Sequence, residues 1–222
     1  MDLNNVIIRI CIEVLPLVLA ITLHEAAHGY VARMFGDNTA YMMGRVTLNP
    51  ARHIDPVGTI LFPLISLAFG GIVFGWAKPV PVNFGNLRNP KRDMFWVAAA
   101  GPASNLVQAT VWGALAAVIQ AVGSSESIVA TFWFYVAIAG IRWNVVLAIF
   151  NLFPILPLDG GRIVTSMLPA RLAYSYSRLE PYGMPILIGL ILMMVVVQPV
   201  GAAFQGLLNA GTGFFVSLFG LS

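Results

Sequence analysis

The sequence is poor in charged side chains. Only 9% of its 222 residues are Asp, Glu, Lys or Arg, whereas 59% are hydrophobic. A soluble domain has about 25% charged and about 45–50% apolar residues, so this chain lacks the polar surface that a water-soluble fold requires. Two stretches, 94–122 and 181–222, have no charge at all. About 20 apolar residues are enough to cross the hydrocarbon layer of a bilayer, and the composition therefore predicts an integral membrane protein.

Cysteine is nearly absent, and no soluble module is visible. The single Cys11 excludes an internal disulfide. Because no repeat or polar domain interrupts the chain, we expect a single domain, 1–222, with a core at 6–162 and C-terminal helices at 183–222. The first apolar run continues to Arg33 without a signal-peptide cleavage site, which predicts a retained membrane helix. The net charge of +3 is small, and no nucleic-acid partner is predicted.

The apolar runs predict an all-α membrane protein with a polytopic helix bundle. Three core transmembrane helices are expected at 6–34, 94–122 and 128–153. The final block has room for one or two further transmembrane helices, and we expect two passes that turn at 198–201. The run at 57–74 is broken by proline and glycine, which favours a re-entrant segment. The proline-containing stretch 77–84 is expected to be extended on the cytoplasmic side.

Basic residues set the expected orientation in a cell membrane. Cytoplasmic loops carry an excess of Lys and Arg. Three connecting regions hold nine of the basic residues: Arg45, Arg52, Lys78, Arg88, Lys91, Arg92, Arg162, Arg171 and Arg178. These regions are therefore expected inside, with the N-terminus outside and the C-terminus inside. Glu13 and Arg142 are charges within spans, for which an ion pair, a polar cavity and ordinary bundle packing all stay open.

The first span contains a cluster of ionisable residues, His24-Glu25-Ala26-Ala27-His28. Residues four apart lie on one helix face, so both imidazoles can bind one metal ion. Glu25 is offset by about 100° but can reach a water molecule there. This spacing is typical of zinc hydrolases, in which the glutamate is the general base. The alternative is a chance match or histidines bonded within a core, but the cost of ionisable groups in a membrane favours a functional cluster.

Two histidines do not complete a catalytic zinc site, which normally has three protein ligands. The sequence offers five candidates for the third: His53, Asp55, Asp93, Asp159 and Glu180. Asp159 stands out because it lies in NLFPILPLDGGR, at the cytoplasmic end of the third core span. Proline and glycine break the helix there and can turn the carboxylate toward the bundle. A plain turn residue before two glycines is an equally open interpretation.

Three motifs together resemble the site-2 protease family of intramembrane zinc metalloproteases. They are HEAAH in a first membrane helix, N-x-x-P-x-x-P-L-D-G-G at 151–161 and G-P-x-x-N at 101–105. The resemblance extends from about Leu23 to Arg162. Without an inserted PDZ-like or CBS-like domain, the layout is similar to that of the compact prokaryotic members. The resemblance implies a Zn²⁺ cofactor, three ligands, a base and two assisting residues: His24, His28 and Asp159 as ligands, Glu25 as base, Asn151 at the substrate or oxyanion, and Asn105 near the site.

The function expected from this resemblance is zinc-dependent cleavage of transmembrane segments in membrane-protein substrates, as in regulated intramembrane proteolysis. A substrate helix must unwind first, and the stretch 77–84 can receive it as an added strand through Val80 and Val82. A simple proline-rich loop is the alternative. Expected partners are the transmembrane substrate and the lipid bilayer, with a second copy or an accessory regulatory membrane protein as further candidates. The rival function is a metal-ion transporter with the same His and Asp cluster as its transit site, although no repeated halves are visible.

Overall fold

All regular secondary structure in the described residues of this computed structural model is helical; these residues are 3–61, 77–124 and 126–221. The elements are α1 (Leu3–Met34), α2 (Thr39–Met42), η1 (Pro50–Arg52), η2 (Pro56–Leu61), η3 (Phe84–Asn86), α4 (Pro90–Val122), α5 (Ile128–Asn151), α6 (Asp159–Met167), α7 (Ala170–Ser177), η4 (Glu180–Tyr182), α8 (Gly183–Val196) and α9 (Gln198–Leu218). By length and composition, four stretches can cross a membrane: 7–34, 90–122, 128–151 and 170–196. The predicted class, a polytopic helical membrane protein, is confirmed.

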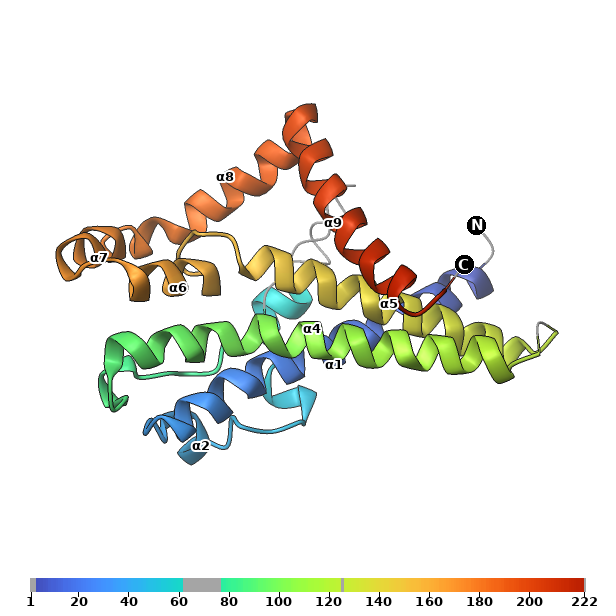
Figure 1. Cartoon of the computed structure of the whole chain (residues 1–222), viewed down its shortest axis with the longest axis horizontal. Coiled ribbons are helices and arrows are strands. Elements are labelled where there is room, and N and C mark those ends of the chain that lie inside the picture. Colours follow the sequence, from blue (N-terminus) through green and yellow to red (C-terminus); the bar gives the residue numbers. More distant parts are fainter. Residues whose placement is uncertain (1–2, 62–76, 125, 222) are drawn as a thin grey trace.

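The helices α1, α4 and α5 pack together as the core bundle (Figure 1). Small side chains line their contacts: Ala109 and Ala116 of α4 and Ala137 of α5 are fully buried. A Cβ on Gly140 would lie only 2.4 Å from the ring of Trp112. Such residues let transmembrane helices approach closely, which matters because lipid leaves little hydrophobic drive for their association. The central helix is α5: 44% of its most apolar stretch is buried, compared with 22% in α1 and 28% in α4.

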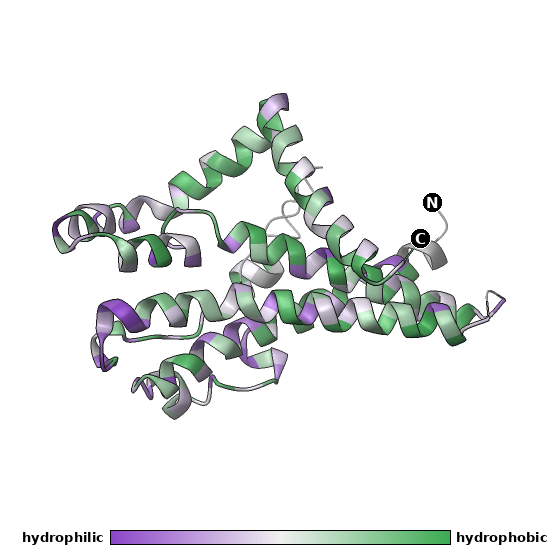
Figure 2. Cartoon of the chain, in the orientation of Figure 1, coloured by the Kyte–Doolittle hydropathy of each residue, from purple (hydrophilic) through white to green (hydrophobic). Residues whose placement is uncertain are grey.

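The two ends of the bundle differ in polarity. α1 ends, α4 begins and α5 ends at the left in Figure 1, where α2, α6 and α7 also lie. Figure 2 shows hydrophilic residues gathered at this end and hydrophobic residues along the helices. We call it the basic end, because the basic connecting regions 35–56 and 77–93 meet there. The opposite end, where α4 ends and α5 begins, is the far end.

Helix boundaries lie close to the expected ones, and the differences have local causes. α4 begins at Pro90 rather than 94, because proline is favoured at the first helical position, where no N–H is needed. α5 ends at Asn151 rather than 153, ahead of Pro154. Of the expected re-entrant segment 57–74, the first residues form the short π-helix η2. The rest of that prediction, from residue 62 on, lies outside the described residues.

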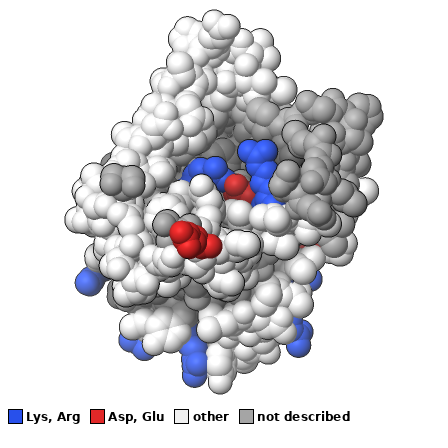
Figure 3. All heavy atoms as spheres, turned by 90° about the vertical axis from the view of Figure 1, so that its right-hand side faces the viewer, with Lys and Arg blue, Asp and Glu red and all other residues white. Residues whose placement is uncertain are grey.

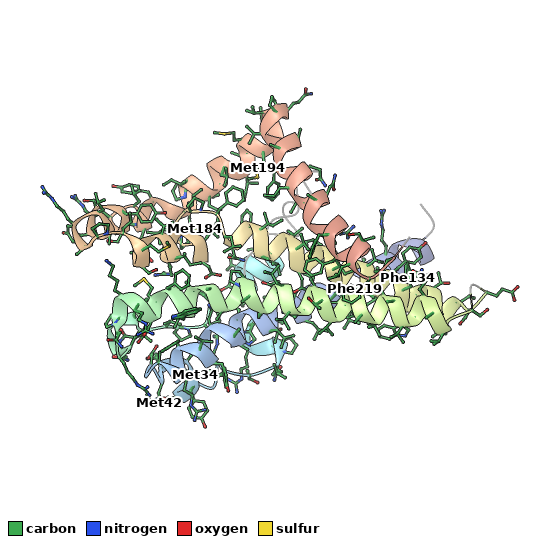
Figure 4. All side chains as sticks on the ribbon, in the orientation of Figure 1. Met34, Met42, Phe134, Met184, Met194 and Phe219 are labelled. Atoms are coloured by element: carbon green, nitrogen blue, oxygen red, sulfur yellow. The ribbon has the colours of Figure 1, made fainter. Side chains whose placement is uncertain are left out.

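The C-terminal block forms two helices, but it does not cross twice. α8 and α9 both advance from the basic end toward the far end, so α9 ends at the far end, the end of the bundle at which α1 begins (Figure 1). The expected return of the chain to the basic end is therefore wrong. The 14 residues of α8 are about 21 Å long, short of a hydrocarbon layer of about 30 Å, but the longer stretch 170–196 that ends with α8 can cross by length and composition, and α9 is not among the crossing stretches of the described residues. At the far end, Phe219, just after α9, and Phe134 of α5 pack against the same buried cluster (Figure 4).

The two charges within spans pair with each other. Arg142 of α5 donates to Glu13 Oε2 of α1, and the Trp143 Nε1 donates to the same oxygen at 2.8 Å. Half of the Arg142 side chain is exposed. Figure 3 shows basic and acidic side chains together in a hollow seen from the far end. Of the alternatives left open by the sequence, the ion pair is the one that the structure contains.

Candidate metal centre

α1 presents His24 and His28 on one face, as their spacing requires. Their Nε2 atoms are 3.1 Å apart. Asp159, the first residue of α6, places Oδ2 3.3 Å from each Nε2 atom. The three side chains are largely enclosed, with exposed fractions of 8, 12 and 13%. Among the described residues, no other group of three His, Cys, Asp or Glu side chains is arranged to share an ion.

The hydrogen bonds of both rings show where their protons lie. His28 Nδ1 is 2.7 Å from the carbonyl oxygen of Val97, which can only accept, so Nδ1 carries the proton. His24 Nδ1 is 2.6 Å from Asn105 Oδ1, again an acceptor. In neutral rings both Nε2 atoms are therefore bare lone pairs. Asp159 Oδ2 is buried without a hydrogen-bond partner among the described residues.

Three lone-pair atoms that face one another at these distances repel unless a cation lies between them. Zinc binds imidazole nitrogen at about 2.0–2.1 Å, and a tetrahedral site then separates neighbouring ligands by about 3.3 Å. The observed separations of 3.1 and 3.3 Å match this value. Two nitrogens and one carboxylate oxygen also form a donor set that zinc accepts, with the fourth position left open as in catalytic sites. The residues present therefore fit a catalytic zinc ion.

A chain of two asparagines fixes the orientation of His24. Asn144 Nδ2 donates to Gly140 O at 2.9 Å, so Asn144 Oδ1 faces Asn105. Asn105 Nδ2 donates to Asn144 Oδ1 at 2.9 Å and to Ala20 O at 3.3 Å, which leaves its own Oδ1 for the imidazole. Both asparagines are completely buried. Two backbone carbonyls thus determine, through two amides, which ring nitrogen of His24 is free for a metal.

A glycine lets α4 approach the two rings. A Cβ on Gly101 would lie 2.4 Å from His28 Nε2 and 2.5 Å from His24 Cε1. Real Cβ atoms do not approach so closely, because 3.0 Å is already shorter than their van der Waals contacts. Gly101 is the first residue of the G-P-x-x-N motif, and Asn105 is its last. The motif therefore supplies both the clearance for the histidines and the acceptor that orients one of them.

Asp159 reaches the histidines because the chain turns sharply between α5 and α6. Gly160 and Gly161 pack directly on this turn. A Cβ on Gly160 would lie 2.3 Å from Leu152 O, and a Cβ on Gly161 would lie 2.5 Å from Leu156 N. The peptide bond between Leu156 and Pro157 is cis. A carboxylate at the first position of a helix is also favoured by the partial positive charge of the helix N-terminus. The aspartate is both a turn residue and a member of the cluster.

Glu25 contacts the connecting segment 77–83. Its Oε2 accepts a hydrogen bond from the Val80 backbone N–H at 2.7 Å. Residues 77–83 have no regular secondary structure, and no strand is present in the described part of the chain. The side chain of Val80 is buried and lies against Gly29. Val82 packs with Ala32 and Leu87. The predicted extended segment therefore lies along α1, beside the predicted base.

Asp37 anchors the C-terminal part of the same segment, at Asn83. It is completely buried. Its Oδ2 accepts the Asn83 N–H at 2.7 Å, and its Oδ1 accepts from Thr39 N at 3.0 Å and Asn86 Nδ2 at 3.2 Å. Burial alone would raise the pKa of this carboxyl, but the hydrogen bonds from Thr39, Asn83 and Asn86 outweigh it and lower the pKa below its ordinary value. The carboxylate is therefore charged at neutral pH and holds the segment in place.

The other predicted residues have hydrogen-bond partners outside the cluster. Asn151, the last residue of α5, donates from Nδ2 to Leu147 O at 3.0 Å. Of the alternative third ligands, Asp93 accepts from Asn89 N, and Glu180 pairs with Arg162 at 2.8 Å. His53 bonds Thr47 O at 3.0 Å, and Asp55 accepts from the N–H groups of residues 57 and 58.

Sequence reasoning missed Asn144. One signal was present: an amide in the otherwise apolar span 128–151 is costly unless it has a partner. Asn144 is also seven residues, or two turns, before Asn151, on the same face of α5. The carbonyl of Val97, by contrast, leaves no trace in the sequence, because any residue supplies one.

Comparison with known proteins gives the family. A family model described as peptidase family M50 matches residues 114–196. A protein of Bacillus subtilis (strain 168) with the name "Putative zinc metalloprotease YwhC" is 38% identical over 216 residues, which cover 93% of this chain and 90% of the relative. The chain belongs to peptidase family M50, the site-2 proteases.

Further M50 relatives are less similar. The Rip2 protein of Mycolicibacterium smegmatis is 33% identical over 143 residues, 64% of this chain and 51% of that protein. Rip2 of Mycobacterium tuberculosis is 29% identical over 167 residues, 75% of this chain and 55% of that protein. Both names describe zinc metalloproteases. No solved structure gives a significant match. The M50 family is zinc-dependent, so the metal predicted from the sequence is confirmed at the level of the family.

Proposed function

We propose that this protein is an intramembrane zinc endopeptidase that hydrolyses peptide bonds in the transmembrane segments of membrane-protein substrates. The observation that carries the proposal is the convergence of His24, His28 and Asp159 on one point inside a bundle of membrane-spanning helices, with Glu25 next to His24 in the chain. These three residues are the proposed zinc ligands. Membership of the M50 family supports the reaction class.

The residues divide the chemistry between them. Zinc, when bound, acidifies a water molecule and polarises a carbonyl group. Glu25 takes up the proton of the attacking water and returns it to the leaving amine, a general acid–base role worth about 10²–10⁴ in rate. Asn105 keeps His24 in the tautomer with a free Nε2. A second group must stabilise the negative charge that develops on the substrate oxygen.

Asn151 is the proposed donor to that developing charge. It lies at the end of α5, eight residues before Asp159 and beside the turn that carries the aspartate. Its Nδ2 donates to Leu147 O, a contact within its own helix. Because a substrate oxygen that gains negative charge is a stronger acceptor than a helix carbonyl, rotation of the side chain toward substrate exchanges a weaker hydrogen bond for a stronger one.

The segment 77–83 is the proposed binding edge for an unwound substrate. Among the described residues the backbone N–H and C=O of Val82 have no hydrogen-bond partner. Val80 N–H is occupied by Glu25, and Lys78 N–H by His53 O at 2.9 Å. A substrate strand that pairs at Val82 would therefore lie two residues along the segment from Val80, the residue that Glu25 contacts. A photo-crosslinker at 82, compared with one at the exposed Asn86 of the same loop, tests this edge.

The proposed location is the cytoplasmic face of a cell membrane. His28 is six residues before the end of α1, about 9 Å along the helix axis from the basic end. The excess of Lys and Arg in the loops of that end supports its placement inside. Water then reaches the cluster without crossing the bilayer. The proposed partners are the transmembrane substrate and the lipid; a second copy or an accessory regulatory protein stays a prediction.

The deciding experiment uses the purified protein in liposomes with a model transmembrane substrate. We expect cleavage that stops with a chelator and returns with Zn²⁺. Glu25→Gln should abolish cleavage while zinc stays bound, and Asp159→Asn should lose both. Glu126→Gln, at an exposed loop of the far end, is the matched control and should cleave normally. Zinc flux without cleavage would establish the transporter instead, and full cleavage by zinc-bound Glu25→Gln would remove Glu25 as the base.

A further inference from the structure

Arg45 has a buried positive charge near Glu25. Its exposed fraction is 7%, and no Asp or Glu among the described residues forms an ion pair with it. Its Nη2 donates to the carbonyl oxygens of Lys78 at 2.8 Å and Pro79 at 3.2 Å. Nε is buried with no partner in the described part of the chain. Because a buried charge without a counter-ion is costly, these two carbonyl contacts are the main compensation for this guanidinium.

A single peptide group connects Arg45 to Glu25. The C=O of the Pro79–Val80 peptide accepts from Arg45, and its N–H donates to Glu25 Oε2 at 2.7 Å. This peptide is not cis; the described residues contain one cis bond, between 156 and 157. In a trans peptide the oxygen and the hydrogen point in opposite directions. The cation and the anion therefore lie on opposite sides of one planar unit, and each polarises it in the sense that strengthens the other contact.

The neighbouring prolines make this peptide the sole donor at its position. Pro79 and Pro81 have no N–H, so Val80 supplies the only backbone donor between Lys78 and Val82. Proline also restricts its own φ and favours extended backbone in the residue before it. The segment thus offers Glu25 one hydrogen bond at one place, and the carbonyl held by Arg45 sets the tilt of that peptide.

We propose that Arg45 is a positioning residue for Glu25. Through the Pro79–Val80 peptide it fixes the direction of the carboxylate and keeps one carboxylate oxygen bonded, so that the other stays available to a water molecule at the metal. The contact itself does not depend on the reaction, whereas its effect on catalysis rests on the function proposed above. The simpler alternative is that Arg45 only fastens the 77–83 loop to the protein.

Asp37 provides the variant that separates these two roles. It fastens the same segment through Asn83 N–H, at the other end, and does not touch the Val80 peptide. Asp37→Ala and Arg45→Met both remove one anchor of the loop. Only Arg45→Met removes a contact to the peptide that Glu25 holds. A general loosening affects Val80 equally in both variants, and a positioning role affects it in Arg45→Met alone.

The first measurement is amide hydrogen exchange in the full-length protein in detergent or nanodiscs. Between residues 78 and 82 only Lys78, Val80 and Val82 have a backbone amide hydrogen, because the other two residues are proline. We expect Arg45→Met to speed exchange at Val80 about tenfold or more, as Glu25→Ala also does, while Asp37→Ala changes it less than about threefold. Equal exchange at Val80 in the wild type and in Arg45→Met, or equal effects of Arg45→Met and Asp37→Ala, would overturn the proposal.

The second measurement is the kinetics of cleavage with zinc content determined in parallel. Arg45→Met should lower kcat about 10–100-fold with KM and bound zinc nearly unchanged, since misdirection of a catalytic group affects the chemical step. Arg45→Lys, which keeps the charge and a donor, should recover part of that loss. A rise in KM with constant kcat would show a loop anchor and contradict positioning.

The two readouts fail separately. If wild-type protein cleaves no membrane substrate but Val80 exchange responds as expected, the contact stands and the proposed protease function falls. Where Arg45→Met does not fold, Val80→Pro removes the donor N–H itself between two residues that are already proline. It should then reproduce the loss of kcat, and wild-type kcat in Val80→Pro would contradict the proposal.

Discussion

Asn144 and Asn105 meet inside the bundle through a 2.9 Å hydrogen bond between Oδ1 of the first and Nδ2 of the second, and neither is exposed to solvent. This pair ties α5 to α4 and, through His24, ties both helices to α1. The amide of Asn144 is anchored in turn by Gly140 O. The orientation of His24, a proposed metal ligand on α1, therefore depends on a hydrogen-bond chain that begins on a different helix.

Disruption of this chain should weaken metal binding before it weakens folding. Asn105→Leu is expected to lower zinc affinity about 10–100-fold, the usual loss when the outer partner of a ligand histidine is removed. Asn144→Leu acts one bond further away and should have a smaller effect. A competition titration with a chromophoric chelator measures both. Gln120→Leu, an exposed amide on α4 near the far end, is the control; a loss of affinity there equal to that of Asn105→Leu would contradict the mechanism.

Gly101→Ala should disturb the metal cluster by contact alone. Its Cβ would come within 2.6 Å of three ring atoms of the two histidines, so α4 or the rings must move. Alanine is otherwise favourable in a helix, and helix content by circular dichroism should not fall. We expect zinc affinity and cleavage to drop together. Gly206→Ala, whose Cβ meets no atom within 4 Å, is the matched control on α9 and should retain both.

Metal removal should lower thermal stability, because an ion that binds only the folded state stabilises that state by an amount that grows with the ratio of free ion concentration to Kd. At a free concentration of 100 times Kd the gain is about 2.7 kcal/mol. The melting temperature of chelator-treated protein should therefore rise on addition of Zn²⁺. His28→Ala should show no such rise. A rise of equal size in His28→Ala would place the stabilising zinc at a different site.

The Glu13–Arg142 pair should behave as a unit. Glu13→Gln leaves the arginine charge without its partner in an apolar bundle, and we expect the melting temperature to fall by about 2–6 °C. Glu13→Gln combined with Arg142→Met removes both charges and should restore much of that loss. Thermal unfolding followed by tryptophan fluorescence checks this, with Trp143 as a local reporter. If the loss of stability in the double variant equals the sum of the losses in Glu13→Gln and in Arg142→Met alone, the interaction between the two charges contributes nothing.

Acid should release the anchor at Asp37. Its pKa is lowered in the folded protein, so its contribution to stability is complete above the unfolded value of about 3.8 and is lost as pH falls below that toward the folded pKa. The difference in melting temperature between wild type and Asp37→Asn should therefore shrink between pH 5 and pH 3. A difference that is constant over this range would show that the charge of Asp37 is not what holds Asn83.

The helical class and the metal cluster could be predicted because each rests on a local pattern. Charge-free runs are enough to predict membrane helices, and the four-residue spacing of His24 and His28 fixes their common face. Asp159 was harder, since its approach depends on a turn of seven residues, 152–158, whose path no periodicity reveals. Gly101 was noted as part of a motif, but its role as clearance for two rings appears only when α4 lies against α1.

Other features were not predictable, for physical reasons. The peptide bridge from Arg45 to Glu25 uses backbone atoms of Pro79 and Val80, which every residue pair possesses. The predicted C-terminal topology is wrong because apolar length was counted in residues: 42 residues without charge suffice for two crossings, but the chain breaks at Val197, and of the two resulting parts 170–196 has the length and composition of a span while α9 does not.

The start of α1 and the end of α9 lie at the same end of the bundle, which has a practical consequence. Reporter domains fused to either terminus should appear in the same compartment, opposite to a tag inserted in the loop that holds Arg45. An alkaline phosphatase fusion and a fluorescent fusion at each end would read out that sidedness in living cells. A tag inserted in the Ser124–Ser127 turn, which joins α4 to α5 at the same end, should report the same compartment as both termini.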